Sequence, residues 1–183
     1  LTDGEKPQMA SANPSDAIGR RLTRLDRFLI TGIGTVVGSE QGDDLHTLLK
    51  ELQQHQERVG LGVNTSRNRN AARQTLQAHG VTPDILICAT GTEIYYGDRL
   101  HFGKGWETHI SAQWKREDVV DLLSDIPFLT YRAENAQGPF KVSYKMSPGK
   151  DRLAHIHDRL LRNRCRCNLI YDENHYLDVV PYR

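Results

Sequence analysis

The sequence lacks long hydrophobic runs and carries almost no net charge. No stretch approaches the roughly 20 apolar residues of a membrane-spanning helix, and the N-terminal region has no apolar segment typical of a secretion signal. The net charge is +1 over 183 residues, which gives no electrostatic reason to expect nucleic acid or an anionic membrane as the main partner. We therefore expect no nucleic acid and no membrane among the partners.

Cysteine is scarce as well, and its three occurrences form no recognisable framework. Cys88, Cys165 and Cys167 show no C-x-x-C spacing, and no paired set of histidines stands near them. Neither a disulfide scaffold nor a zinc site is expected from this pattern. We expect three buried structural cysteines, no metal site and a cytoplasmic protein.

What the sequence does have is the composition of a globular domain. Hydrophobic residues make up 38% and charged residues 26% of a chain that is long enough to bury one good core. The exception is the polar stretch 1–24, which contains Pro7 and Pro14 and shows no sustained hydrophobic period. We interpret residues 1–24 as a linker or tail, which implies a preceding segment.

Apolar and amphipathic segments alternate after position 25. The apolar segments, which predict strands, are 27–30, 59–66 and 83–90. The amphipathic segments, which predict helices, are 43–58 and 68–80. Strands that alternate with helices at this spacing favour a parallel sheet and an α/β fold.

The pattern changes in the second half of the chain. Residues 91–103 predict a hairpin, and the boundary to a second unit is expected near 102–106. Helices are then predicted at 111–126 and 148–164, and strands at 128–133, 140–146, 165–172 and 176–183. This order of helix, two strands, helix, two strands is typical of an α+β layer.

Four strings, in the same order, resemble one protein family. They are NTSRNRNAARQTLQAHGVTPDILICATGTEIYY at 64–96, WETHISAQWKRE at 106–117, FKVSYKM at 140–146 and NLIYDENHYLDVVPYR at 168–183. The chain resembles sucrose-phosphate phosphatase, and most of all the phosphatase-like C-terminal domain of sucrose-phosphate synthases, both in the haloacid dehalogenase superfamily. The resemblance implies an α/β, haloacid dehalogenase-like Rossmannoid parallel-sheet core over 25–104, incomplete here, with an inserted α+β cap domain over 105–183.

The ligands of open α/β sheets bind at the carboxyl ends of the strands, where segments 32–35, 65–66 and 91–93 fall. By the resemblance, Thr65, with Ser66 beside it, holds a phosphoryl group, and the cap grips the sugar. The sugar-binding candidates by motif match are Glu93, His109, Lys141, Ser143 and Tyr144.

Structural alternatives stand beside each of these assignments. Lys141 and Ser143 alternate with apolar residues along one predicted strand, which is also typical of a solvated polar face. His109 is as compatible with a cap of the next helix as with a sugar contact. Thr65 and Ser66 are suited to cap the helix that begins near Asn68.

The family pattern breaks at the end of the first strand. The family uses two carboxylates in the form D-x-D-x-T, one as nucleophile and one as acid and base, with Mg²⁺ at the phosphate. Here the two positions are Gly32 and Gly34, and the nearest acidic residues follow at least six residues later. Gly32 and Gly34 therefore mark lost carboxylates, no catalytic residue is expected, and Mg²⁺ is expected only if the chain is an active phosphatase.

A second departure concerns the residues that follow DVVPYR in the family, a Lys that binds phosphate and an Asp-rich loop that holds Mg²⁺. The given sequence reaches Arg183 without either. The strands that flank the first strand in the family are also missing, and a bare parallel edge is unfavourable. Either the parent protein continues, or another chain covers the edge, or the fold has shrunk.

The sequence therefore predicts a degenerate, non-catalytic phosphatase-like domain of a sucrose-phosphate synthase with a binding, docking or regulatory role. Its expected partners are sucrose 6-phosphate, an upstream glycosyltransferase domain and a separate sucrose-phosphate phosphatase. One alternative is an active, Mg²⁺-dependent sucrose 6-phosphate phosphatase. A second alternative is a purely structural or oligomerising module.

Overall fold

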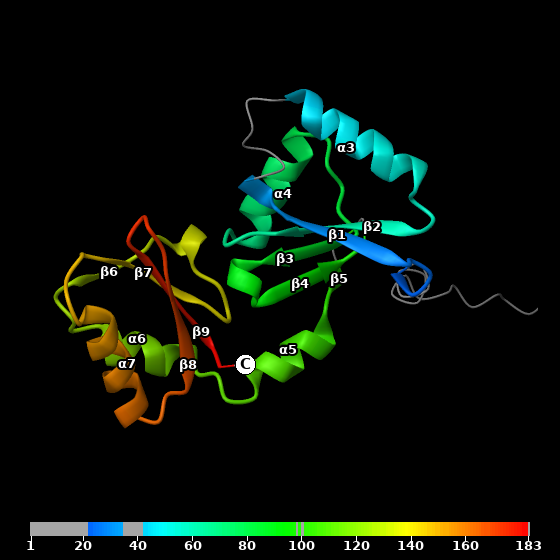
Figure 1. The fold of residues 1–183 in the computed structure, drawn as a ribbon. Coiled ribbons are helices and arrows are strands. Elements are labelled where there is room, and N and C mark those ends of the chain that lie inside the picture. Colours follow the sequence, from blue (N-terminus) through cyan, green and yellow to red (C-terminus); the bar gives the residue numbers. More distant parts are fainter. Residues whose placement is uncertain (1–21, 35–41, 98, 100, 183) are drawn as a thin grey trace, which may run out of the picture.

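The computed structural model describes residues 22–34, 42–97, 99 and 101–182. Two β-sheets follow one another along this part of the chain, each with helices on one face (Figure 1). The elements of the first sheet come before residue 103 and those of the second come after residue 128. Among the described residues, we find no helix long and apolar enough to cross a membrane.

The first sheet has the strand order β1-β2-β3-β4-β5. Its strands are β1 (Arg27–Gly32), β2 (Val59–Asn64), β3 (Ile85–Cys88), β4 (Glu93–Tyr96) and β5 (His101–Phe102). Strands β1, β2 and β3 are parallel, as the alternating pattern predicts, while β4 and β5 add to the sheet as the predicted antiparallel hairpin. The connecting helices are α3 (Gly42–Gln54) and α4 (Arg69–Ala78).

Both connecting helices lie on the same face of the first sheet (Figure 1). Leucine side chains of α3 and α4 pack on Leu61 and Val63 of β2 and on Leu86 and Cys88 of β3. These alternate positions point to one face because side chains along a strand alternate between faces. Cys88 is fully buried in this core, as predicted.

The opposite face of the sheet is built around two glycines of β2. A Cβ atom at Gly60 would stand 2.5 Å from Cε1 of Phe28, and one at Gly62 would stand 3.0 Å from Cγ1 of Ile30. The side chains of β1 therefore lie across these glycines. Ile30 remains 53% exposed, and β2 is the neighbour of β1 among the described strands.

The second sheet is antiparallel, with the order β6-β7-β9-β8. Its strands are β6 (Leu129–Tyr131), β7 (Val142–Met146), β8 (Cys167–Tyr171) and β9 (Tyr176–Pro181). Helices α6 (Arg116–Leu123) and α7 (Arg152–Arg162) cover one face, and a short helix, α5 (Lys104–Ser111), precedes them. The predicted mixture of helices and strands is therefore present, in an α+β layer.

The helix predicted at 111–126 is wrong in its first part. Residues up to Ser111 belong to α5, and α6 begins only at Arg116. The intervening turn is fixed by Trp114, whose indole Nε1 donates a hydrogen bond to the carbonyl oxygen of Pro139 at 2.8 Å. The hydrogen bond of Trp114 to a distant residue thus lies at a break between two helices, where the sequence pattern predicts one continuous helix.

Strand β7 divides the second sheet into an apolar face and a polar face. Val142, Tyr144 and Met146 pack with the apolar residues of α6 and α7. Lys141, just before the strand, and Ser143 point the other way, since successive side chains alternate. The polar face is directed toward the first sheet, because Lys141 contacts Ser66 there.

Candidate functional site

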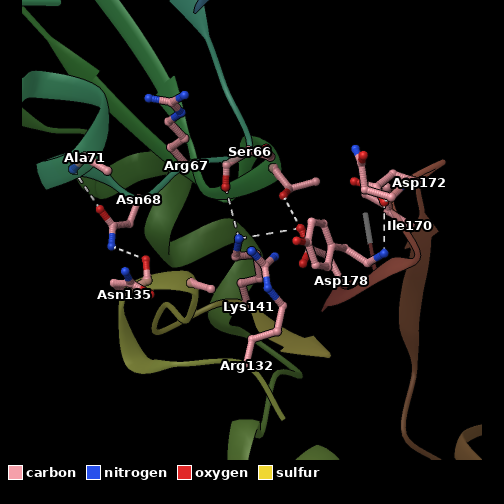
Figure 2. A pocket seen from close by; sticks show the side chains of 14 residues that line it. Ser66, Arg67, Asn68, Ala71, Arg132, Asn135, Lys141, Ile170, Asp172 and Asp178 are labelled. Carbon is pink, nitrogen blue, oxygen red and sulfur yellow. Dashed lines mark hydrogen bonds and ion pairs between the residues drawn. The ribbon is translucent and has the colours of Figure 1, made fainter. Parts of the chain in front are cut away.

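A polar cavity of about 590 Å³ lies between the two sheets. Figure 2 shows its lining side chains. The first sheet and its loops contribute Ser66, Arg67, Asn68, Ala71 and Thr90, and the second contributes Arg132, Asn135, Ala136, Lys141, Ile170, Asp172, Asn174, Tyr176 and Asp178. The carboxyl ends of β2 and β3 open into the cavity, which is where the ligands of α/β sheets bind.

A buried ion pair forms part of the cavity wall. The ammonium group of Lys141 lies 3.5 Å from the carboxylate of Asp178 and donates to the carbonyl oxygen of Ser66 at 3.0 Å. Burial lowers the pKa of Lys141, and the charge of Asp178 opposes that effect. The two side chains are 3% and 10% exposed, so the pair is almost completely removed from water.

Asp178 also accepts hydrogen bonds from two hydroxyl groups. Ser143 donates to its Oδ1 at 2.6 Å and Thr90 donates to its Oδ2 at 2.7 Å. Thr90 lies in the turn between β3 and β4 of the first sheet, so this carboxylate joins the two sheets. With Lys141 as the third donor, both oxygens of Asp178 are satisfied, as a buried carboxylate requires.

The loop that carries Thr90 has an unusual backbone. Ala89 and Thr90, in the 3₁₀ turn η1 (Ala89–Gly91), have positive φ angles of 49° and 63°. Non-glycine residues occupy this region only when their surroundings hold them there, at a cost of about 1–3 kcal/mol each. Here the amide of Thr90 donates to the carbonyl oxygen of Thr65 at 3.3 Å, and its hydroxyl group is held by Asp178.

Arg132 presents a fixed guanidinium group at the cavity wall. The guanidinium carbon lies 3.8 Å from the centroid of the Tyr176 ring, and Nη1 donates to Oγ of Ser143 at 3.1 Å. The backbone of Arg132 is held as well, because its amide donates to Ser143 and its carbonyl accepts from Gln137. Sequence reasoning missed Arg132, since a single arginine in a loop gives no signal before its neighbours are known.

Asn68 links the two sheets at another side of the cavity. Its Oδ1 accepts from the amide of Ala71 at 2.9 Å, which makes it the N-cap of α4, and its Nδ2 donates to the carbonyl oxygen of Asn135 at 2.5 Å. Thr65 is not the cap, because its Oγ1 accepts from the amide of Arg67 at 3.2 Å. The alternative that Thr65 caps this helix is therefore wrong.

The two glycines predicted to replace carboxylates lie at the end of β1. Gly32 pairs with Asn64 at the end of β2, and an added Cβ at Gly34 would have no heavy atom within 4 Å. Among the residues that the structure describes, no group of three His, Cys, Asp or Glu is placed to hold a metal ion. Thr35, which stands one residue before the position of the motif's Thr, lies outside the described residues.

The comparison with known families decides where this fold belongs. A family model described as sucrose-6F-phosphate phosphohydrolase matches residues 23–183. The chain belongs to this family. Among curated members, it is 35% identical over 103 residues to sucrose-phosphatase 1 of Nicotiana tabacum and 32% identical over 103 residues to probable sucrose-phosphatase 2 of Arabidopsis thaliana. Each match covers 55% of this chain and 24% of the relative's length.

Solved structures place the fold in the haloacid dehalogenase group. The sucrose-phosphatase from Synechocystis sp. PCC6803, described in complex with sucrose and phosphate, has a TM-score of 0.75 at 21% identity. That match covers 86% of this chain and 64% of the other. A haloacid dehalogenase-like hydrolase protein from Bacillus subtilis gives 0.53 at 14% identity, over 91% of this chain and 72% of the other. The predicted fold class is confirmed.

Two of the sugar-binding candidates predicted from the family resemblance lie at the cavity. Lys141 is in its lining, and Ser143 stands directly behind, bonded to Asp178 and Arg132. Both are buried, with 2% and 0% of their surface exposed. The alternative that they form a solvated polar face is therefore wrong. Ser66 also lines the cavity, whereas Thr65 does not.

The other three candidates of the family set lie elsewhere. Tyr144 packs in the apolar core of the second sheet, where burial raises the pKa of its phenol to about 12. Glu93 is buried beside the cavity and accepts a hydrogen bond from Tyr95 at 2.6 Å. His109 is exposed on α5, its ring lies tilted against that of Trp106, and it lines a separate cavity of about 290 Å³.

The cysteines near the end of the chain lie at the edge of the second core. Cys165 and Cys167 are half-buried and pack against its apolar residues. Burial raises the pKa of both thiols, for Cys167 to about 12. A raised thiol pKa disfavours the thiolate that metals bind, so their surroundings suit a structural role.

Proposed function

We propose that this chain is a non-hydrolysing, sucrose 6-phosphate-binding domain, the phosphatase-like part of a sucrose-phosphate synthase. The observation that carries the proposal is the pair Gly32 and Gly34 at the carboxyl end of β1, where the family's reaction needs two carboxylates. A glycine supplies neither a nucleophile for phosphorus nor a proton carrier. The aspartyl-phosphate route to hydrolysis is therefore closed to this chain.

The same end of the sheet does not fit Mg²⁺. Positions 32 and 34 offer no side-chain oxygen, and Asn64 at the end of β2 and Thr65 after it offer only neutral ones. Mg²⁺ in proteins is held by carboxylates together with water and phosphate oxygens. We propose that the domain works without a metal cofactor, and that Mg²⁺ becomes relevant only when the carboxylates are restored.

Support for retained binding comes from the cavity between the sheets. It has the volume of a small-ligand site and is lined by hydroxyl, amide and charged side chains. A family member in the same fold is described in complex with sucrose and phosphate. We propose that the cavity takes the same chemical class, a phosphorylated disaccharide.

The parent protein that we propose transfers glucose from a nucleotide sugar to fructose 6-phosphate in an upstream glycosyltransferase domain. The phosphatase-like domain would then hold the product, sucrose 6-phosphate, or dock a separate sucrose-phosphate phosphatase. Such roles need binding but no turnover, which agrees with glycines at the two positions where the family's reaction needs carboxylates. We propose a cytoplasmic location for this parent protein.

Phosphate release from sucrose 6-phosphate in the presence of Mg²⁺ tests the loss of catalysis. We expect no turnover by the unchanged chain, while an active sucrose-phosphatase serves as the positive control. Turnover above about 1 per second, an ordinary enzyme rate, would overturn the proposal in favour of an active phosphatase. Gly34→Asp is a useful companion variant, because the added side chain meets open space.

Calorimetric titration with sucrose and with sucrose 6-phosphate tests the binding role separately. We expect heat from sucrose 6-phosphate binding in the absence of Mg²⁺. If neither ligand binds, the domain is a structural or oligomerising module instead. Phosphate release and calorimetry together therefore separate the three functions that the sequence leaves open.

A further inference from the structure

Helices α6 and α7 lie side by side on the face of the second sheet that points away from the cavity between the sheets (Figure 1). Asp125, just after α6, lies 2.6 Å from Nη2 of Arg159 in the last turn of α7. Trp114, just before α6, and Arg166, after α7, line the same cavity of about 290 Å³. The start of α6 is therefore beside the residues that follow α7, and its end is beside the last turn of α7.

The exposed side of α6 carries carboxylates. Glu117, Asp118 and Asp121 are all exposed there. Asp118 lies 3.9 Å from the ammonium group of Lys115. Glu117 and Asp121, which stand one helical turn apart on the same side, have no ion pair in the described part of the chain. We call these two residues the acidic row.

The neighbouring surface, at the end of α7, carries arginines and an exposed leucine. Arg164 and Arg166 are exposed, and no ion pair with a described residue is found for either. We call these two residues the basic row. Leu161 is 58% exposed and lines a cavity of about 250 Å³ together with Arg166, and the described lining of this cavity contains no Asp or Glu. An apolar centre with charged groups at its rim is the usual anatomy of a protein interface.

We propose that the acidic row and the basic row, together with Leu161, form a dimer interface that binds a second copy of this chain. The two rows lie next to one another, so a partner that carries one sign of charge would meet a row of the same sign. A second copy, related by a twofold axis that runs along the boundary between α6 and α7, places its acidic row on the basic row of the first. The symmetry makes the reverse contact as well, so each attraction occurs twice.

Dimer formation through this face is independent of the proposed function. The two helices cover the side of the second sheet opposite to Lys141 and Ser143, so the cavity between the sheets stays open in the dimer. Exposed ion pairs contribute little each and are screened by salt. We therefore expect a dissociation constant of about 1–100 µM that rises with the salt concentration.

Sedimentation velocity of the unchanged chain, from about 1 µM to about 500 µM, tests the dimer itself. We expect the mass to rise from one chain to two over this range. Glu117→Lys with Asp121→Lys reverses the acidic row, and Arg164→Glu with Arg166→Glu reverses the basic row. Each double variant alone should dimerise at least about 10-fold more weakly, because rows of like charge then face each other. An equal mixture of the two should form a heterodimer, since every row again meets one of opposite sign.

Arg73→Glu is the matched control, because this exposed arginine lies on α4 of the first sheet. Circular dichroism checks the folding of each variant. Leu161→Ser, which should weaken the dimer about 10-fold by removing apolar contact, carries the test if a reversed variant does not fold. A single chain at every concentration would overturn the proposal. A dimer that both reversed variants form as tightly as the unchanged chain would overturn it too, because the contact would then lie elsewhere. The same holds if the mixed variants do not associate.

Discussion

The ammonium group of Lys141 lies 3.5 Å from the carboxylate of Asp178, inside the contact between the two sheets. Asp178 lies on β9 and Lys141 stands just before β7, yet Lys141 also binds Ser66 and Asp178 also binds Thr90, which follow β2 and β3 of the first sheet. Burying two charges has a large desolvation cost, which their mutual attraction offsets only with good additional hydrogen bonds. The pair therefore stabilises the contact between the sheets as long as both partners are present.

Removing one member of this pair should destabilise the protein strongly. We expect Asp178→Asn to lower the free energy of unfolding by about 3–5 kcal/mol, because Lys141 is left buried without a counter-charge. Lys141→Met should cost less, since Ser143 and Thr90 still donate to Asp178. The double variant should cost clearly less than the sum of the two, and urea unfolding of all four chains measures this coupling. Additive losses would show that the charges do not act as a pair.

Asn68 gives a second prediction, because one side chain makes two separable bonds. Asn68→Ala removes the cap of α4 and the bond to Asn135, whereas Asn68→Asp keeps an acceptor for Ala71 and removes the donor. We expect Asn68→Ala to lose about 1 kcal/mol of stability from the cap alone. Asn68→Asp should retain the cap, so that amide hydrogen exchange in α4 stays slow. Equal exchange of α4 in both variants would contradict the assignment of Asn68 as the cap.

The alternation of strands and helices could be predicted from the sequence because it is a local property. Hydrophobic periods of two and of about 3.6 residues select strands and helices without reference to distant residues. This holds for the parallel strands and for the hairpin that follows them. The turn at Trp114 could not be predicted in this way, since it depends on a hydrogen bond to Pro139.

The cavity was only partly predictable for a similar reason. Lys141 and Ser143 share a strand face, and strict alternation along β7 already indicates that Tyr144 faces the opposite side. The alternation in the sequence therefore suffices to separate Lys141 and Ser143, which face the cavity, from Tyr144, which does not. No such pattern identifies Arg132, because its place in the cavity wall depends on the Tyr176 ring, which is brought beside it by the folding of a distant strand.

Gly60 supports a third prediction, on the packing of β1 against β2. Gly60→Ala would place a Cβ atom 2.5 Å from Cε1 of Phe28 and 2.8 Å from Cδ1 of Leu25. We expect a loss of about 1–3 kcal/mol in the free energy of unfolding, as for other overpacked sites. Gly105→Ala, in α5, is the matched control, since nothing lies within 4 Å of its added Cβ.

Gly60→Ala and Gly105→Ala should therefore change the free energy of unfolding in opposite directions. Gly105→Ala should stabilise the protein slightly, because alanine is preferred over glycine in a helix and Gly105 lies in the first turn of α5. Urea unfolding of both variants and the unchanged chain gives the comparison. Similar effects at the two positions would show that the Phe28 ring moves aside at no cost.

The buried thiol of Cys88 gives a prediction on pH. Burial, assisted by the nearby Glu93 carboxylate, raises the pKa of Cys88 from 9.0 to about 12. Between these two values the unfolded chain loses the thiol proton while the folded chain keeps it. The folded state then binds more protons, so its stability is complete below the unfolded pKa and falls as the pH rises toward the folded pKa.

We expect the contribution of Cys88 to this decline to approach about 1.4 kcal/mol per pH unit. The measurement is urea unfolding of the unchanged chain and of Cys88→Ala between about pH 7 and about pH 10.5. The variant loses stability at every pH because it leaves a small cavity, so the slope is the informative quantity. The two slopes should agree below about pH 8 and diverge above about pH 9, where the steeper decline belongs to the unchanged chain. Parallel curves over the whole range would mean that this thiol ionises as readily in the folded protein as in the unfolded one.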